Sequence, residues 1–434
     1  MTEDLWALSP LEGRYRRYVA SLRTYLSEAA FFYYRLQVET RYFRALASLP
    51  LPPLQRLPSS LLQQLESAYE PFTEEVLTAL RKIEAQTRHD VKAIEYFLRE
   101  RWTAFFPPEF HGALAFIHFG LTSQDVNTTA QALMIRDALK QVYYPALEAL
   151  LQSLHERAYA WRSMAMLSFT HGQPASPTTL GKELYVYVVR LKSEYESLQQ
   201  VPFWTKLGGA VGNLNAHRLA YPEVDWVSFF EQFAAQLGLK RFPLTTQILP
   251  YERWAEIWDS LRRLQAILID LAQDIWLYVH RGYLQLHRAE GQIGSSTMPH
   301  KVNPILFELA EGNLHLSNAM WSFFTAKLPI SRLQRDLSDS TILRNLGVAL
   351  GYGLVGIQAL QEGLALLSPN EEALRQDLEA HPEILSEAWQ ILERKAGQVN
   401  AYELAQEAIK QGRFSVDIPP TAYLGYAPES IPPP

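Results

Sequence analysis

The chain of 434 residues is 48% hydrophobic and 20% charged, so it is too apolar to be disordered and long enough for roughly three domains. Its net charge of −6 supplies no overall attraction for nucleic acid or an anionic membrane, so an anionic ligand must meet locally clustered arginine and lysine side chains. The absence of cysteine excludes disulfide bonds, iron–sulfur clusters and cysteine-ligated zinc, and it fits a cytoplasmic protein.

The first predicted domain covers residues 1–111 and is helical. Its first residues are acidic and then basic, without the apolar run of a secretory signal, which again favours the cytoplasm. Apolar residues recur at helical spacing at Leu22, Leu26 and Tyr33. The proline-rich segment from Leu49 to Pro58 is predicted to be a loop inside this domain.

The second predicted domain, residues 112–364, consists of long helical stretches, which is typical of a helix bundle with loops at its ends. Thr122 followed by Asp125 has the pattern of a helix start, as does Pro177. Exposed N–H groups at a helix start are a natural site for an anion. Loops are expected around Thr122 and at residues 170–177, 208–215 and 291–304.

The stretch between Arg344 and Glu362 is uncharged, but it is short for a membrane span and carries Asn345 and Gln358. Its glycines are therefore expected to allow close helix contacts inside a core: Gly347, Gly351, Gly353 and Gly356. The third predicted domain, residues 365–434, is short and helical and ends in a proline-rich tail.

Three strings carry the candidate chemistry. Residues 294–304 read GSSTMPHKVNP, a Gly/Pro-punctuated loop that could close over a ligand. A serine there is a poor base unless a cation such as Lys301 stabilises its alkoxide, and the alternative is a solvated turn.

The other two strings contain a histidine and a helix start. In SFTHGQPASPTT, residues 168–179, His171 has polar neighbours that suit proton transfer, although a lone histidine is usually structural. In HFGLTSQDVNTT, residues 118–129, Thr122 and Ser123 could bind a carboxylate, but taken alone an ordinary helix cap is the better explanation.

Together these strings resemble the fumarase and aspartase superfamily, whose members share three separated segments and a GSSxMPxKxNP loop. Within it, THGQPASPTT, the loop ending MPHKVNP and the segment TRHDVKAIEYFL at residues 87–98 resemble the bacterial adenylosuccinate lyases. Fumarases and argininosuccinate lyases carry a THLQ-like string in place of THGQ. The similarity runs from Gly13 to the string TAYLGYA near the C-terminus, although the stretch between Tyr402 and Ala422 looks abbreviated.

The resemblance implies an all-α fold of three domains with a central bundle of long helices. It implies β-elimination of fumarate from adenylosuccinate to give AMP, and from the succinylated aminoimidazole carboxamide ribonucleotide (SAICAR to AICAR), in purine biosynthesis. It implies no cofactor, and a homotetramer whose active sites are shared between subunits.

The resemblance also implies roles for individual residues. Ser295 would be the base, His171 would protonate the departing nitrogen, and Glu308 would pair with His171, although Glu308 could equally be a surface glutamate. The groups that would hold the succinyl carboxylates are Lys301, Asn303, Thr122 and Ser123. The other expected substrate contacts are His89, Asp90, Val91 and Gln247 towards the nucleotide, and Arg14, Tyr15, Arg335, Ser340 and Arg344 at the phosphate.

The arginine pair allows a structural prediction. Arg335 and Arg344 are nine residues apart, which on one straight helix would separate them by about 13 Å. One phosphate cannot bridge that distance, so residues 338–340 (SDS) are predicted to form a turn. The alternative for this string is a solvated charged face.

Two readings compete with this function, and a metal site is rejected. The rivals are another fumarate-releasing lyase and a catalytically silent helical scaffold. The chain has eleven histidines, but the pairs His111 with His118 and His280 with His287 are seven residues apart, which is simple helical repetition, and no HExxH string occurs.

Overall fold

The computed structural model describes residues 6–288, 298 and 300–434, and helices dominate it, as the all-α prediction requires. The chain forms two compact units, each built from three separate segments. Unit 1 comprises Met1–Pro145, Leu198–Arg262 and Ala319–Gly351, and unit 2 comprises Ala146–Ser197, Arg263–Asn318 and Tyr352–Pro434. The division into domains 1–111, 112–364 and 365–434 stays a prediction.

Unit 1 is a helical body with one short parallel strand pair. Its α-helices are α1 (Arg16–Val19), α2 (Arg23–Leu26), α3 (Glu28–Leu46), α4 (Ser59–Gln64), α5 (Glu74–Thr87), α6 (Asp90–Phe105), α7 (Ser123–Ala138), α10 (Asn215–Ala220), α11 (Trp226–Gln236) and α14 (Ser338–Leu343). A π-helical stretch, η4 (Leu139–Tyr143), continues α7. The 3-10 helices are η1 (Ala20–Leu22), η2 (Leu65–Ala68) and η3 (Pro108–Phe116), and the strands are β3 (Trp204–Thr205) and β4 (Lys240–Arg241).

The core of unit 1 forms where α3 packs against α7. Leu36, Val38 and Tyr42 of α3 are fully buried, and so is Leu133 of α7; both helices bury residues on all sides, as helices inside a core do. Residues 47–58 between α3 and α4 are non-helical, as the prolines predicted.

Helix α7 begins where the sequence predicted, directly after Thr122. The Asp125 carboxylate accepts a hydrogen bond from the Thr122 N–H at 2.8 Å and completes a capping box. Such a cap satisfies one free N–H group at the helix start, and the first turn of the helix still presents others.

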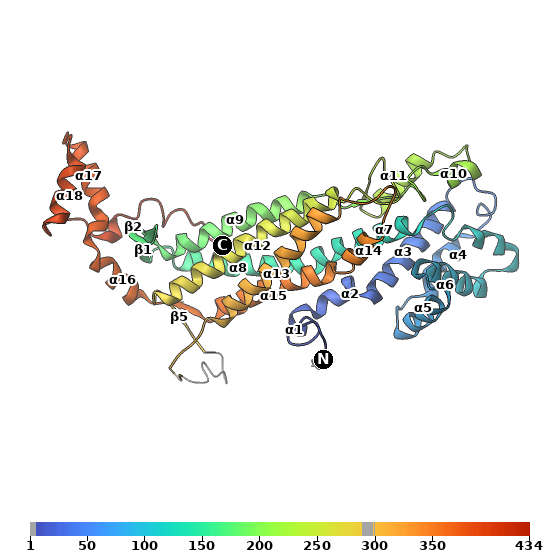
Figure 1. Ribbon diagram of the computed structural model, residues 1–434, viewed down its shortest axis with the longest axis horizontal. Coiled ribbons are helices and arrows are strands. Elements are labelled where there is room, and N and C mark those ends of the chain that lie inside the picture. The colour runs from blue at the N-terminus through green and yellow to red at the C-terminus, as the bar shows by residue number, and fades with distance from the viewer. Residues whose placement is uncertain (1–5, 289–297, 299) are drawn as a thin grey trace. The chain divides into compact units, whose positions relative to one another are not determined.

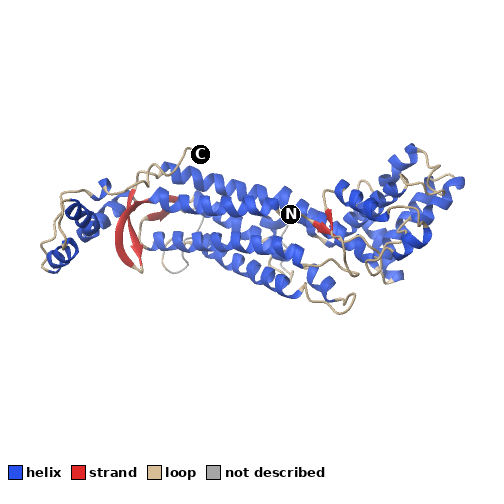
Figure 2. Cartoon of the chain, turned by 90° about the horizontal axis from the view of Figure 1, so that it is seen from above, coloured by secondary structure: helices blue, strands red, loops and turns tan. Residues whose placement is uncertain are grey.

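Unit 2 contains five long helices that run side by side (Figures 1 and 2). These are the larger parts of α8 (Tyr144–Ala160), α9 (Leu180–Gln200), α12 (Glu252–His280), α13 (Ile305–Lys327) and α15 (Leu346–Ala365). One end of each of these helices is assigned to unit 1, because the boundary between the units falls inside the helix. Polar contacts join neighbouring helices, for example Gln273 of α12 to Glu311 of α13 at 2.8 Å.

The remaining elements of unit 2 are shorter. They are β1 (Ala165–Thr170), β2 (Gln173–Thr179), β5 (Leu284–Leu286), β6 (Leu367–Pro369), α16 (Glu371–Ala380), η5 (Pro382–Leu385), α17 (Ser386–Lys395), α18 (Ala401–Lys410) and η6 (Pro420–Ala422). Strands β1 and β2 pair antiparallel, as do β5 and β6.

The glycines of α15 make the close contacts that the sequence predicted. A Cβ on Gly356 would lie 2.5 Å from Cγ of Leu314 in α13, and one on Gly347 would lie 3.0 Å from the Leu26 carbonyl. By length and composition alone, Ser338–Ala365 could also cross a membrane. Close packing against α13 is, however, the behaviour of a core helix.

The structure overturns the prediction of a loop at residues 170–177, because most of them belong to the β1–β2 hairpin, the long strand pair in Figure 2. Thr170 pairs with Gln173, which leaves His171 and Gly172 as a two-residue turn with φ of 54° and 72°. A turn with two positive φ values matches the twist of the strands that it joins. Helix α9 then begins three residues after Pro177.

Candidate active site

The predicted residues divide between the two units. Thr122, Ser123, Gln247 and the residues assigned to the nucleotide and its phosphate lie in unit 1, whereas His171, Lys301, Asn303 and Glu308 lie in unit 2. Ser295 lies outside the described residues.

Asp90 and Arg344 come together in unit 1 around a buried arginine. Asp90 begins α6, capped by His89, and its Oδ2 lies 2.6 Å from Nη2 of Arg35 and 3.7 Å from Nη2 of Arg344. Burial opposes ionisation of Asp90, but the Arg35 guanidinium and the Val91 N–H outweigh it and hold the pKa of this carboxyl below its usual value. Arg344 also pairs with Glu28 and remains exposed.

Arg335, Ser340 and Gln247 form a second group in unit 1. The Arg335 guanidinium donates to Oγ of Ser340 at 2.6 Å and to Oε1 of Gln247 at 3.4 Å. It also lies 3.3 Å from the Asp339 carboxylate, which is only 4% exposed and accepts from the Tyr251 hydroxyl at 3.1 Å. Arg335 is therefore held in place from several sides.

The turn predicted at residues 338–340 is wrong, because these residues are the first turn of α14. Just before this helix, the Asp336 Oδ1 accepts the Ser338 N–H at 2.8 Å, a local hydrogen bond that supports the helix start. Arg335 precedes the helix and Arg344 follows it, so the two arginines have different partners.

A chain of hydrogen-bonded side chains, most of them buried, links the two groups. Arg35 donates to Asn127 at 2.8 Å, Asn127 to Gln124 at 3.0 Å, and Gln124 to Asp339 at 2.9 Å. We call this chain the polar network; its members are Arg344, Asp90, Arg35, Asn127, Gln124, Asp339 and Arg335. It passes through Gln124 and Asn127 in the first turns of α7, the helix that begins directly after Thr122.

The interior members of the polar network were not predicted from the sequence. Gln124 and Asn127 are spaced by one helical turn, and Gln124 is 2% exposed. Polar residues that recur at helical spacing, Gln124, Asn127 and Gln131, were the available signal. Their partners, Arg35 and Asp339, are far away in the chain and leave no local pattern.

Arg14 and Tyr15 lie at the start of α1, where Arg14 is exposed and Tyr15 is partly buried. Glu12 and Val19, on either side of this pair, line a cavity of about 170 Å³ together with Arg344. The N-terminal segment and Arg344 thus line one cavity, which is compatible with one ligand that contacts both. Neither Arg14 nor Arg335 is among the residues that line it.

A larger cavity of about 580 Å³ lies in unit 1 beside the second group. Thr246, Ile248 and Gln334, the chain neighbours of Gln247 and Arg335, are among its lining residues. Its volume falls within the range of cavities that hold small organic ligands.

In unit 2, His171 occupies the exposed tip of the hairpin, and Glu308 lies in the first turn of α13. Oε1 of Glu308 accepts a hydrogen bond from the Trp276 indole at 3.1 Å rather than from His171. Lys301 is exposed and Asn303 partly buried. Pairing of Glu308 with His171 stays a prediction.

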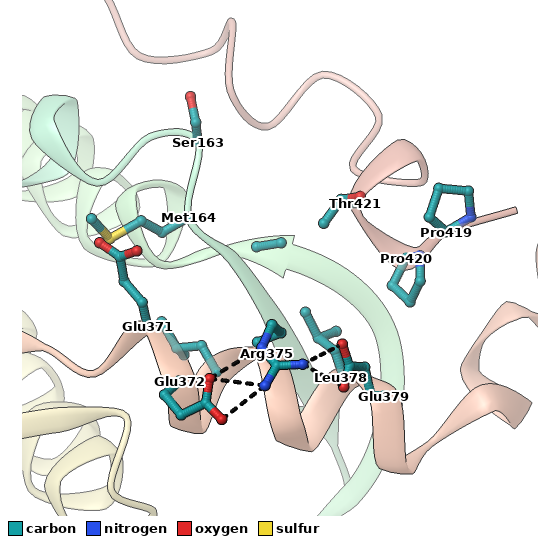
Figure 3. A pocket seen from close by; sticks show the side chains of 12 residues that line it. Ser163, Met164, Glu371, Glu372, Arg375, Leu378, Glu379, Pro419, Pro420 and Thr421 are labelled. Atoms are coloured by element: carbon teal, nitrogen blue, oxygen red, sulfur yellow. Dashed lines mark hydrogen bonds and ion pairs between the residues drawn. The ribbon is translucent and has the colours of Figure 1, made fainter.

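Unit 2 also contains a cavity of about 610 Å³ that holds none of the predicted residues (Figure 3). Three glutamates line it, and its Arg375 pairs with two of them, Glu372 at 2.8 Å and Glu379 at 2.7 Å. Carboxylates around a cavity repel an anionic nucleotide, so we do not assign the substrate to it.

The histidine pairs considered for a metal have other partners. His111 contacts the Phe106 carbonyl at 2.9 Å, and His118 contacts Glu39 at 2.5 Å. His280 stacks on Trp276, and Nε2 of His287 lies 2.6 Å from the Ser368 hydroxyl. Among residues 6–288, 298 and 300–434, no group of three or more His, Cys, Asp or Glu could hold a metal ion.

Comparison with known proteins bears on both the fold and the site. The Lyase family model matches residues 13–319, and the model of the adenylosuccinate lyase C-terminal region matches residues 331–418. Two solved structures share the fold: a 3-carboxy-cis,cis-muconate lactonizing enzyme from Pseudomonas putida (TM-score 0.75, 23% identity, 96% of this chain and 97% of the other) and a fumarate lyase from Mesorhizobium sp. BNC1 (TM-score 0.74, 19% identity, 95% and 96%).

Relatives of higher identity cover nearly the whole chain. The adenylosuccinate lyase of Dictyostelium discoideum is 45% identical over 410 residues, which are 93% of this chain and 88% of the relative. That of Escherichia coli (strain K12) is 42% identical over 415 residues, 95% of this chain and 91% of the relative. The chain therefore belongs to the adenylosuccinate lyase family.

Proposed function

We propose that this protein is a carbon–nitrogen lyase that eliminates fumarate from adenylosuccinate to give AMP, and from SAICAR to give AICAR, in purine biosynthesis. The observation that carries the proposal is the identity of 45% and 42% to two relatives named adenylosuccinate lyase, over 93% and 95% of the chain. An anionic nucleotide also suits a site in which Arg335 is held by the buried Asp339 and Arg344 by Asp90 and Glu28.

The elimination needs a base, an acid and donors for negative charge. Ser295 removes the proton from the carbon beside a succinyl carboxylate, and His171 protonates the nitrogen as the carbon–nitrogen bond breaks. Between these two proton transfers, negative charge builds up on the succinyl carboxylate beside the deprotonated carbon. Lys301, Asn303 and the N–H groups at the start of α7 stabilise it, and preorganised donors of this kind contribute several kcal/mol, roughly a hundredfold or more in rate. The exposure of His171 supports its role, because it can reach a ligand.

The nucleotide lies along the first turns of α6 and α7. Asp90, with His89 and Val91, faces the base and ribose, and Gln247 adds a further contact. The phosphate meets Arg335, Ser340, Arg344 and the N-terminal pair Arg14 and Tyr15. Arginine suits this task because its planar fork donates two hydrogen bonds to phosphate oxygens.

The assembly that we propose is a homotetramer with active sites shared between subunits, located in the cytoplasm. Large apolar side chains are exposed on the unit 2 parts of three long helices: Val186 and Val189 on α9, Leu277 on α12 and Leu316 on α13. Exposed apolar faces on neighbouring helices are typical of surfaces that another subunit covers.

The test is an absorbance assay of the purified protein with adenylosuccinate, SAICAR, argininosuccinate and malate. We expect cleavage of the first two only. Ser295→Ala and His171→Ala should each lower kcat by about a hundredfold or more, the scale of a lost general base or acid. His111→Ala, outside the proposed site, is the control and should retain full activity. Turnover of argininosuccinate or malate would support the rival lyase, and inactivity on all four substrates would support a silent scaffold.

A further inference from the structure

The loop that follows β3, residues 206–212, is tied to the start of α7 by a buried ion pair. Nζ of Lys206 lies 2.7 Å from Oδ1 of Asp125, and both side chains are 0% exposed. The Asp125 carboxylate also accepts the Gly208 N–H at 2.8 Å and the Gly209 N–H at 3.1 Å, in addition to the Thr122 N–H. One carboxylate thus joins the helix start to the loop.

The same loop supports Gln247 from its other side. The Gln247 amide donates to the Ala210 carbonyl at 2.9 Å while its oxygen accepts from Arg335. The fit is close, because a Cβ on Gly212, whose φ is +82°, would overlap the Thr245 carbonyl. A shift of the loop would therefore move Gln247 and the start of α7 together.

Stability alone does not explain this pair. Burial lowers the pKa of Lys206, and the Asp125 carboxylate only partly opposes that effect. Desolvation of two charges commonly outweighs their attraction, so an apolar or neutral pair of the same size often folds as well or better. A charged pair that also collects three backbone N–H groups fixes a geometry instead.

We propose that Asp125 and Lys206 are positioning residues for the lyase reaction. They fix the Thr122–Ser123 backbone relative to the Gln247 amide. Thr122 and Ser123 can then bind the succinyl group of the same substrate molecule whose nucleotide contacts Gln247. The proposal rests on the proposed function, which assigns Thr122, Ser123 and Gln247 to the substrate.

The test compares Asp125→Asn, Lys206→Met and the double variant in steady-state kinetics, with urea denaturation alongside. Each single change leaves a buried charge or dipole unmatched and should lower both stability and kcat. The double variant should regain most of the stability, because neither charge remains. It should nevertheless keep a loss in kcat of about tenfold to a hundredfold, the scale of a misplaced donor, with a smaller change in KM.

Tyr34→Phe is the control, because it removes a partly buried hydrogen bond to Asp137 at the other end of α7. It should lower stability without lowering kcat. If the double variant does not fold, Lys206→Arg is the second variant; its larger cation has to displace Gly208 and Gly209, so kcat should again fall.

A double variant, or Lys206→Arg, with kcat within twofold of wild type would overturn the positioning role. Failure of the proposed function is distinguished by the wild-type assay, because an inactive wild type contradicts that function before any variant is compared.

Discussion

His217 is a buried histidine whose charge the fold controls. It is 0% exposed, its Nε2 lies 3.0 Å from the Tyr42 hydroxyl, and a Cβ on Gly120 would lie 2.6 Å from its ring. Burial lowers the pKa of His217 to about 4, from an ordinary value of 6.5. The folded protein therefore holds this ring neutral at neutral pH.

This burial predicts a loss of stability in mild acid. Between pH 6.5 and pH 4 the unfolded state binds a proton at His217 that the folded state does not, so the free energy of unfolding falls as the pH falls. The loss approaches about 3 kcal/mol when the pH reaches the folded-state value. His217→Gln should remove this component, so the stability difference between wild type and variant, measured by urea denaturation, should shrink from pH 7 to pH 4.5.

A constant difference across that range would contradict the buried neutral ring. Comparison with the variant is needed because His118 acts in the opposite direction. Burial disfavours its charge, but Glu39 outweighs this and raises the pKa of His118, so its contribution is present below pH 6.5 and is lost as the pH rises.

Individual residues of the site could be predicted from the sequence only where they sit in motifs. The resemblance assigned His171, Lys301 and Ser340 a role, because the strings around them are characteristic. It assigned none to Arg35 or Lys206, since a single buried cation has no local sequence pattern. The role of such a cation can be recognised only in the folded structure, where its partner comes from a distant segment of the chain.

Among the elements, helix starts were easier to predict than strands. The Thr122 and Asp125 pattern predicted the start of α7 because a capping box lies within four residues of chain. The hairpin was missed because its strands contain Pro174 and Pro177, which disfavour strands, and because the turn uses His–Gly in place of the commoner Asn–Gly. The start of α14 was missed because Asp336, whose Oδ1 accepts the Ser338 N–H, was not recognised as a helix-start signal.

The packing of α15 against α13 predicts that a methyl group added at Gly356 destabilises the protein, whereas one added at an uncrowded glycine does not. Gly356→Ala should lower the free energy of unfolding by about 1–2 kcal/mol, because the strain of the overlap with Leu314 exceeds the gain in helix propensity. Gly112→Ala is the control, since nothing lies within 4 Å of a Cβ there. It should leave stability unchanged or slightly raised. Urea denaturation of both variants checks this, and a fully stable Gly356→Ala protein would refute the close contact.

At the scale of the whole molecule, shared active sites predict that two inactive variants restore each other. Ser295→Ala and His171→Ala proteins are mixed, dissociated and reassembled, and native mass spectrometry verifies that hybrids form. If the two residues of one site come from different chains, random mixing gives roughly a quarter of the sites both wild-type residues, because symmetry repeats each interface. Activity should rise accordingly, while each variant reassembled alone stays inactive. Inactive hybrids would place Ser295 and His171 of one site on the same chain.

The threading of the chain through the two units has a consequence for synthesis on the ribosome. Unit 1 cannot gather its last segment until residue 351 has been made, and unit 2 needs the chain up to residue 434. A nascent chain that ends at residue 318 therefore contains two of the three segments of each unit. Apolar side chains that are buried in the finished protein are still exposed in it. Neither unit can complete its folding before residue 351 has been made, and the unfinished chain is most at risk of aggregation up to that point.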